Sequence, residues 1–272
     1  STGRSRLGRS RPGRSVKDSN RTKQEEVQAK LTLKAIRMFH IGPSANINNI
    51  KFNLFSWKDL TDIAIYPVTH TGDGFGGLRS RVLGTVDRNS HCKACHGDIS
   101  TCPGHYGLIE FAEPIVHPAR YFITDIVNIL KSVCRNCGRL VLATDTVKDI
   151  IANAPMDESR RLALIAEKSE AAETCYHSSK CVRMKDIKSE INDNIAHFYY
   201  NGKKRTPISA RDILTIFESI SKEDAELLGF KEPAHPRNLI LRGIPVIPPC
   251  SRPPTMTESG ELKDSVLTEL YK

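Results

Sequence analysis

The sequence of 272 residues lacks long apolar runs, and no stretch of about 18 hydrophobic residues occurs that could form a membrane span. Its arginine-rich start also lacks the apolar segment that follows the basic residues of a secretory signal. Hydrophobic residues make up 39% and charged residues 26%, which is typical of a globular fold. We therefore expect a protein that is not secreted, has no membrane partner and can form one large core or two smaller ones.

Acidic residues are nearly absent from the start of the chain. Residues 1–23 hold eight basic residues and one acid, so they account for +7 of the net charge of +9. Gly-Arg-Ser recurs at Gly3, Gly8 and Gly13, and this composition cannot bury enough apolar surface to fold. We expect a disordered basic tail over residues 1–30. It is either an arm attracted to nucleic-acid phosphates or a solvated spacer.

Seven of the eight cysteines fall into two clusters, which in a long chain without a secretory signal favours metal binding over disulfides. The first cluster, HCKACHGDISTCPGHYG, spaces four candidate ligands as C-x2-C-x6-C-x2-H: Cys92, Cys95, Cys102 and His105. Such pairs converge on a tetrahedral zinc ion, and four protein ligands leave no position for a catalytic water. A redox C-x2-C would need a βαβ context and would not explain Cys102 and His105. We expect His91 and His96 to be surface groups or to lie just outside the ligand set.

The second cluster supplies the ligands of a second predicted zinc ion: Cys134, Cys137, Cys175 and Cys181. Gly138 follows the first pair and can adopt the positive φ that such turns use. The second pair has a looser x5 gap, and His177 could replace either of its sulfurs. The loop between the pairs is long, but its closure entropy grows only logarithmically with length. Cys250 has no partner in the sequence and is expected to be a packed thiol.

Helical and strand patterns alternate along the rest of the chain. Helical spacing occurs over 24–40, 57–65, 119–134, 145–173 with a break at Pro155, 210–220, 222–230 and the C-terminal end. Capping pairs begin three of these helices: Ser56 with Asp59, Ser209 with Asp212, and Ser221 with Asp224. The helix over 119–134 is expected to bury Phe122, Ile126, Val127, Leu130 and Val133. Strands are predicted over 49–55 and 106–117, the latter entering Pro114.

A glycine-rich loop contains the letters G-x-G-x-x-G at Gly72, Gly74 and Gly77. A dinucleotide site needs a strand before this pattern and an amphipathic helix after it. No helical apolar stripe follows, and another glycine occurs at Gly84. The loop is therefore expected to be a turn.

Several segments occur in an order that resembles one family. CKACHGDISTCPGHYGLIEFAEPIVHP is followed by a helix, VCRNCGRLV, TPISARDILTIFESISKEDAELLGF and GIPVIPPCSRPP. Over roughly residues 46–272 this order is similar to the N-terminal clamp region of the largest subunit of multisubunit DNA-directed RNA polymerases, in its eukaryotic or archaeal form. Cys92, Cys95, Cys102 and His105 match the family's first clamp zinc site. Cys134 and Cys137 match the second, while the spacing of Cys175 and Cys181 departs from it.

The resemblance implies an α+β fold, namely an irregular zinc-stabilised clamp domain with helices and short strands. The disordered basic tail that precedes it is predicted from composition and is not a feature of the family pattern. The expected organisation is tail over 1–30, clamp region with two zinc sites over 31–245, and a Pro-rich segment continuing the clamp over 246–272. The implied role is structural and DNA-retaining within a transcribing nucleotidyltransferase. The implied partners are the rest of the largest subunit, the second-largest subunit, smaller subunits and duplex DNA.

The family's magnesium-binding Asp-Phe-Asp-Gly-Asp motif does not occur, nor does any D-x-D-x-D. The resemblance therefore implies that this chain is not catalytic alone, and that another chain supplies magnesium and its carboxylates. A split subunit of a large DNA virus fits this pattern. The expected location is the nucleus, or host cytoplasm or virion for a viral protein. A free-standing zinc-dependent nucleic-acid-binding regulator is the alternative. The basic residues Lys203, Lys204 and Arg205 either contact DNA or form a solvated loop.

Overall fold

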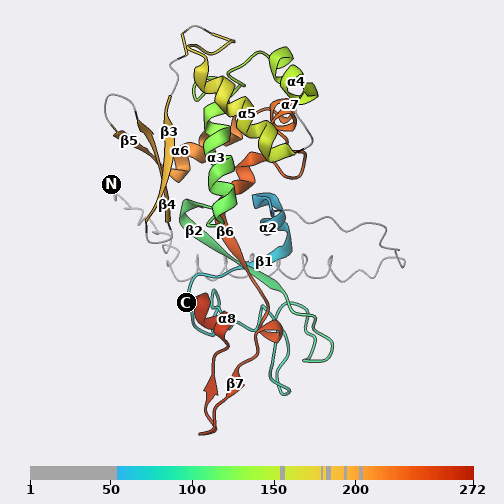
Figure 1. Ribbon diagram of the computed structural model, residues 1–272. Helices are drawn as coiled ribbons and strands as arrows, with labels where there is room; N and C mark the ends of the chain where they lie inside the picture. Colours follow the sequence, from blue (N-terminus) through green and yellow to red (C-terminus); the bar gives the residue numbers. More distant parts are fainter. Residues whose placement is uncertain (1–53, 154–156, 179, 182–184, 193–194, 202–204) are drawn as a thin grey trace, which may run out of the picture. The chain divides into compact units, whose positions relative to one another are not determined.

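The computed structural model describes residues 54–153, 157–178, 180–181, 185–192, 195–201 and 205–272 (Figure 1). These residues form two compact units, each with its own contacts. The large unit comprises residues 54–69 and 107–246, and the small unit comprises residues 70–106 and 247–272. Helices and strands are mixed, so the α+β prediction is confirmed. The predicted tail, the helix over 24–40, Lys203 and Lys204 lie outside the described residues, as does most of the strand over 49–55.

The large unit begins with a capped helix and a three-stranded sheet. In α2 (Trp57–Ile63), Ser56 and Asp59 form the predicted capping box, and the chain then enters β1 (Ala64–Pro67). The sheet order is β1-β2-β6, with β2 (Tyr106–Val116) antiparallel to β6 (Ile240–Val246). The register shifts between Glu110 and Ile115, around Pro114, because proline cannot donate a hydrogen bond to a ladder.

Helix α3 (Arg120–Ser132) lies in the centre of the large unit and packs against α5 (Figure 1). The predicted helix is confirmed, and three of the five residues predicted on its apolar face, Ile126, Leu130 and Val133, are buried. Phe122 and Val127 are partly buried against the same core. The prediction did not include the buried Ile123 and Ile129, because a wide apolar stripe does not show which of its residues face the neighbouring helices.

The remaining helices follow the predicted boundaries. The break at Pro155 separates α4 (Thr144–Asn153) from α5 (Glu158–Ala171). Helix α6 (Ala210–Glu218) has the Ser209–Asp212 capping box. In α7 (Lys222–Leu227), the Ser221 side chain accepts from the Asp224 N–H. Gly229, at φ 98°, follows the end of α7, and the short 3-10 helix η1 (Pro236–Leu239) precedes β6.

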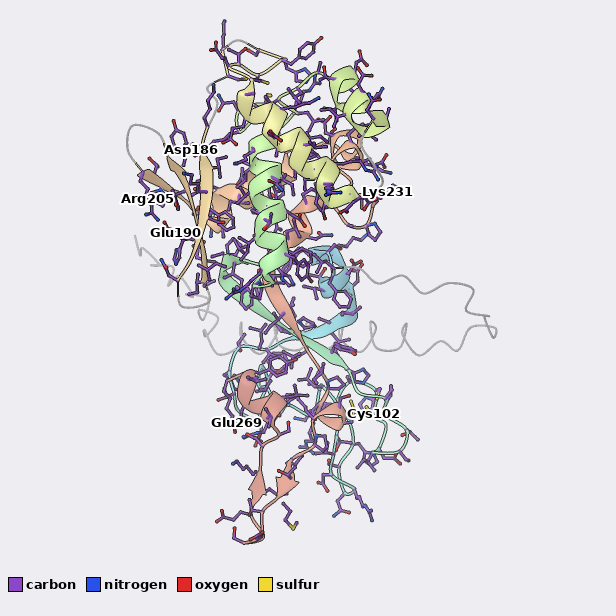
Figure 2. The ribbon with its side chains drawn as sticks, in the orientation of Figure 1. Cys102, Asp186, Glu190, Arg205, Lys231 and Glu269 are labelled. Atoms are coloured by element: carbon purple, nitrogen blue, oxygen red, sulfur yellow. The ribbon has the colours of Figure 1, made fainter. Side chains whose placement is uncertain are left out.

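A second sheet in the large unit is not anticipated from the sequence. It is an antiparallel meander of β3 (Ile187–Asn192), β4 (Ile195–Asn201) and β5 (Arg205–Ile208). Each described strand buries few apolar side chains, chiefly Ile187, Phe198 and Ile208, so its alternation in the sequence is weak. Arg205 ion-pairs with Glu190 and lies 3.8 Å over the Tyr199 ring; Figure 2 labels the first two. This candidate DNA contact is therefore engaged within the sheet.

The small unit is mostly irregular. Residues 70–105 form loops without a helix, which confirms that the G-x-G-x-x-G stretch is a turn. The His70 ring holds this turn, because its Nδ1 accepts from the Gly72 N–H at 3.0 Å. The second segment contains η2 (Pro249–Ser251), a hairpin of β7 (Thr255–Met256) and β8 (Leu262–Lys263), and α8 (Val266–Leu270).

A buried arginine joins the two segments of the small unit. The Arg252 guanidinium donates to the Ile247 and Leu78 carbonyls and to the Thr268 hydroxyl. Burial lowers the pKa of Arg252, yet a guanidinium remains charged, so these acceptors are what make its burial tolerable. Among the described residues of both units, no helix is long and apolar enough to cross a membrane.

Candidate metal centres

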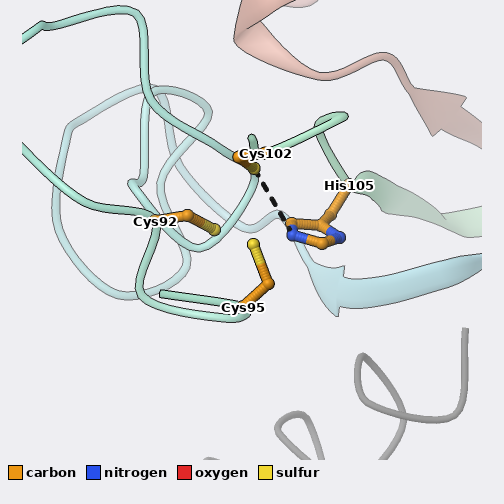
Figure 3. A group of neighbouring side chains, drawn as sticks. All are labelled: Cys92, Cys95, Cys102 and His105. Carbon is orange, nitrogen blue, oxygen red and sulfur yellow. Dashed lines mark hydrogen bonds between the residues drawn. The ribbon is translucent and has the colours of Figure 1, made fainter. Parts of the chain in front are cut away.

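The four predicted residues of the first cluster converge in the small unit (Figure 3). One donor atom from each of Cys92, Cys95, Cys102 and His105 lies within 4.8 Å of all the others. The Cys102 Sγ and the His105 Nε2 are 3.7 Å apart. Donors about 2.0–2.3 Å from a tetrahedral zinc ion are separated by roughly 3.6–3.8 Å, so this spacing fits one ion between them.

The first cysteine pair lies on a tight turn closed by backbone hydrogen bonds. The Cys92 N–H donates to the Gly97 carbonyl, and the His96 N–H donates to the Cys92 carbonyl. His96 adopts a φ of 62°, which is uncommon for a residue other than glycine. The Ala94 N–H donates to the Cys92 sulfur at 3.4 Å and would stabilise a thiolate there. His91 and His96 are exposed and are not in the donor group.

The six residues between Cys95 and Cys102 are ordered by a single carboxylate. Asp98 accepts hydrogen bonds from the backbone and hydroxyl groups of Ser100 and Thr101. These bonds hold the pKa of Asp98 well below its usual range. The Asp98 carbonyl accepts from the Cys102 N–H at 2.9 Å, which positions the third ligand. Sequence spacing does not reveal this role, although Asp followed by Ser and Thr is a recognisable turn signal.

At Gly104 the loop that carries His105 passes close to the chain segment around Pro248 and Cys250. Gly104 has a φ of 83°, and a Cβ there would lie 2.5 Å from Pro248 Cβ and 2.6 Å from Cys250 Sγ. The expectation that Cys250 is a packed thiol is wrong, because Cys250 is exposed. The chain turns outward between prolines, and the Cys250 thiol donates to the Pro103 carbonyl at 3.7 Å.

Burial acts on the donor groups of the first centre. It raises the pKa of Cys92 and raises that of Cys102 to about 12, whereas it lowers the pKa of His105. Without a cation Cys92 and Cys102 would remain neutral thiols. A bound divalent cation reverses this balance and holds coordinating thiols as thiolates. The neutral imidazole that burial favours is the form that binds metal.

The second predicted group also converges, in the large unit. The sulfurs of Cys134, Cys137, Cys175 and Cys181 lie within 4.8 Å of one another. Cys137 Sγ and Cys175 Sγ are 3.7 Å apart, far beyond the roughly 2.05 Å of a disulfide and suited to two ligands of one ion. Burial raises the pKa of Cys175. His177, the alternative ligand, is not in the group, because its Nδ1 faces Arg139 at 3.4 Å.

The turn of the second centre repeats that of the first. The Cys134 N–H donates to the Arg139 carbonyl, and the Gly138 N–H donates to the Cys134 carbonyl. Gly138 has a φ of 69°, in the position that His96 occupies in the first turn. A Cβ on Gly138 would lie 2.6 Å from the Ser219 carbonyl at the end of α6, so the predicted glycine is also required by packing.

Each centre could thus hold a metal ion with four protein donors, three sulfurs and one nitrogen in the first and four sulfurs in the second. Full ligation leaves no coordination position for substrate or water, so such an ion would stabilise the fold and not hydrolyse a substrate.

Comparison with known proteins places this arrangement in a family. Residues 44–272 match the family described as RNA polymerase Rpb1, domain 1. The DNA-directed RNA polymerase subunit Rpo1N of Methanocaldococcus jannaschii is 33% identical over 82% of this chain and 17% of its own length. The DNA-directed RNA polymerase II subunit RPB1 of Euplotoides octocarinatus is 30% identical over 83% of this chain and 52% of its own.

A probable RPB1 homolog of Invertebrate iridescent virus 6 is 28% identical over 82% of this chain and 23% of its own length. The chain therefore spans between 17% and 52% of the length of these three relatives. The family match extends over both metal centres and both compact units. This chain belongs to the family of RNA polymerase Rpb1, domain 1.

Proposed function

We propose that this chain serves as the clamp-bearing N-terminal part of the largest subunit of a DNA-directed RNA polymerase. The observation that carries the proposal is the family match over residues 44–272. A free-standing zinc regulator is disfavoured, because the similarity to polymerase subunits covers 82% of the chain and is not confined to the cysteine clusters. The proposed role is structural and DNA-retaining, with magnesium and its catalytic carboxylates supplied outside these residues.

In this proposal each centre holds one zinc ion. Cys92, Cys95, Cys102 and His105 would bind the first, and Cys134, Cys137, Cys175 and Cys181 the second. Zinc is favoured because it prefers tetrahedral sets of sulfur and nitrogen donors. Its contribution would be to fix loops where few apolar side chains are buried. Elemental analysis should find two zinc ions per chain, and a different metal or a stoichiometry near zero would contradict the assignment.

The proposed assembly contains the rest of the largest subunit, the second-largest subunit, smaller subunits and duplex DNA. The proposed organisation remains a basic tail over 1–30, the clamp region over 31–245 and its continuation over 246–272. The protein would be found where the polymerase acts, in the nucleus, or in host cytoplasm or virion for a viral enzyme.

Native affinity purification from the source, followed by mass spectrometry and a transcription assay, tests the polymerase role. We expect the chain in stoichiometric amounts with a polypeptide carrying Asp-Phe-Asp-Gly-Asp, and transcription by that assembly. The isolated chain should synthesise no RNA, because no D-x-D-x-D occurs in it. Recovery of a lone monomer, with polymerase subunits absent, would support the regulator instead.

A further inference from the structure

The surface over the second metal centre differs in charge from that over the first. The segments 134–139 and 174–181 contain Arg135, Arg139 and Lys180 and no acidic residue. The segment 92–105 around the first centre contains one lysine and one aspartate. Even with Glu173, which adjoins the second segment, basic residues exceed acidic residues around the second centre, whereas they are equal in number within 92–105.

Two of these cations are exposed and lack a carboxylate partner among the described residues. No ion pair within 4.0 Å involves Arg139 or Lys180 there, whereas Arg205, Arg211 and Arg242 each pair with a glutamate. The third cation, Arg135, differs from these two because it lies near the Asp212 carboxylate. Unpaired exposed cations on ordered loops are suited to an anionic partner.

Arg139 and His177 connect the two halves of the metal loop. The Arg139 guanidinium lies 3.4 Å from His177 Nδ1. A guanidinium can only donate, so Nδ1 accepts and the neutral ring carries its proton on Nε2. That N–H is a second donor beside the cation.

Tyr176 provides an aromatic surface at the same place. Its side chain is 68% exposed, although the neighbouring Cys175 is buried. Its N–H donates to the Val141 carbonyl at 3.0 Å, and its ring meets the His177 ring edge-on at 5.4 Å. A large ring is thus presented to solvent by an anchored backbone.

A structural explanation exists for the cations alone. Four thiolates and a divalent cation leave a charge of about −2, which nearby arginine and lysine side chains would offset. This explanation requires no exposed tyrosine. The combination of cations, imidazole N–H and exposed ring matches the surfaces that hold unpaired nucleotides by phosphate contact and base stacking.

We propose that Arg139, Tyr176, His177 and Lys180 form a binding surface for single-stranded nucleic acid. Arg139, Lys180 and the His177 N–H contact phosphates, and Tyr176 stacks on an unpaired base. The inference deepens the proposed polymerase role and rests on it for the presence of nucleic acid. Copurification with polymerase subunits does not depend on this surface, so each claim can fail without the other.

Fluorescence anisotropy on the zinc-loaded full chain tests the surface, with a labelled oligothymidylate or oligouridylate of about 15 nucleotides and a duplex of the same length. The double substitution Arg139→Ala with Lys180→Ala should reduce the salt dependence of single-strand binding, with a slope change of about 1 to 1.5 in log affinity against log salt. Tyr176→Ala should weaken both single strands about tenfold and leave the duplex unchanged.

Matched variants control for charge and aromatic content. Arg160→Ala with Lys168→Ala removes two exposed cations from α5, and Tyr121→Ala removes a tyrosine that is 66% exposed. Affinities of the surface variants equal to those of these controls would overturn the proposal. So would an equal loss of duplex binding in Tyr176→Ala. Zinc content measured on each variant tests the rival explanation, that the cations only offset the charge of the metal centre. If Arg139→Ala with Lys180→Ala loses zinc while its zinc-loaded fraction binds with unchanged affinity, the cations serve charge compensation and the proposal is overturned.

Discussion

The two metal centres share one turn geometry but are set in different surroundings. In the small unit three of the four ligands are buried, and the described residues around them form irregular loops with few apolar side chains. In the large unit Cys137 is exposed, and the centre adjoins a core built from α3, α5 and α6. A bound ion would therefore supplement a small apolar cluster, with Leu78, Val82 and Leu83, in one unit, and would attach a loop to a larger core in the other.

The largest expected effect distinguishes these two roles. Cys102→Ser should unfold the small unit, with a loss above about 4 kcal/mol, because ligation there adds to only a small cluster of buried apolar side chains. Cys181→Ser should loosen residues around 134–141 and 174–181 while α3 and α6 stay folded. Hydrogen exchange with mass spectrometry would report rapid exchange over 70–106 and 247–272 in the first variant only. Equal protection of the small unit in both variants would contradict the comparison.

The next effect concerns the two glycines that approach neighbouring chain segments. Gly138→Ala should cost about 2–3 kcal/mol, because the new Cβ meets the Ser219 carbonyl and the residue has a positive φ. Gly104→Ala should cost a similar amount, since its φ is also positive and the new Cβ meets the rigid ring of Pro248 as well as the Cys250 sulfur. Chemical denaturation of the zinc-loaded proteins measures both values. In a Cys250→Gly background the Gly104→Ala loss should shrink, and an unchanged loss would locate the strain elsewhere.

A smaller effect is expected from the Asp212 carboxylate in the capping box of α6, and it tests whether part of the stability of the large unit is independent of metal. The hydrogen bond from Ser209 holds the pKa of Asp212 below its ordinary value. Stability from this lowered pKa is present above the unfolded value of about 3.9 and is lost as pH falls through the folded pKa. Asp212→Asn should cost about 1 kcal/mol near neutral pH.

The difference between wild type and Asp212→Asn should disappear in acid. Urea denaturation with chelator present, from neutral pH downward, excludes ligand protonation as its source. Asp62→Asn, on the neighbouring helix α2 and outside its capping box, is the control and should show no such pH dependence. A pH-independent difference for Asp212→Asn would show that the carboxylate charge is not responsible.

The smallest expected effect comes from replacing His96, at the positive-φ position of the first turn, by the glycine that the second turn has there. His96→Gly should stabilise the first centre by about 0.5 kcal/mol, because glycine adopts a φ of 62° without the penalty paid by histidine. Competition with a chromogenic zinc chelator should show slower or equal zinc release. Faster release would mean that the His96 side chain supports the site through a contact that its exposed position does not suggest.

Much of the site could be predicted from sequence because ligand spacing is a local property. Cys92, Cys95, Cys102 and His105 lie within one short segment, and each C-x2-C pair determines its own turn. The choice of Cys181 over His177 was left open, because it depends on Arg139, a residue that folding brings near from the other half of the loop.

In the fold, too, the elements with local sequence signals were predicted and those that depend on pairing with other segments were not. Capped helices such as α6 and α7 were predicted, since Ser209 with Asp212 and Ser221 with Asp224 are local signals. The strands β1, β3, β4, β5 and β6 were not, because their stability comes from pairing with other segments, which for β1 and β6 are distant in the sequence. In β3, β4 and β5 a single apolar side chain is buried in each, namely Ile187, Phe198 and Ile208, so no alternation is visible. The predicted face of α3 likewise included Ile126, Leu130 and Val133 but not Ile123 and Ile129, because the buried face depends on the neighbouring helices.

The small unit is discontinuous in the chain, and this determines the order in which it can be completed during synthesis. Its first segment leaves the ribosome before residues 107–246, while the Arg252 anchor to Leu78 requires the last segment. Within that interval the first metal centre is the part that can close, since its ligands span residues 92–105 only. Zinc would then act as a temporary substitute for the missing segment, keeping the nascent loops compact until Arg252 arrives.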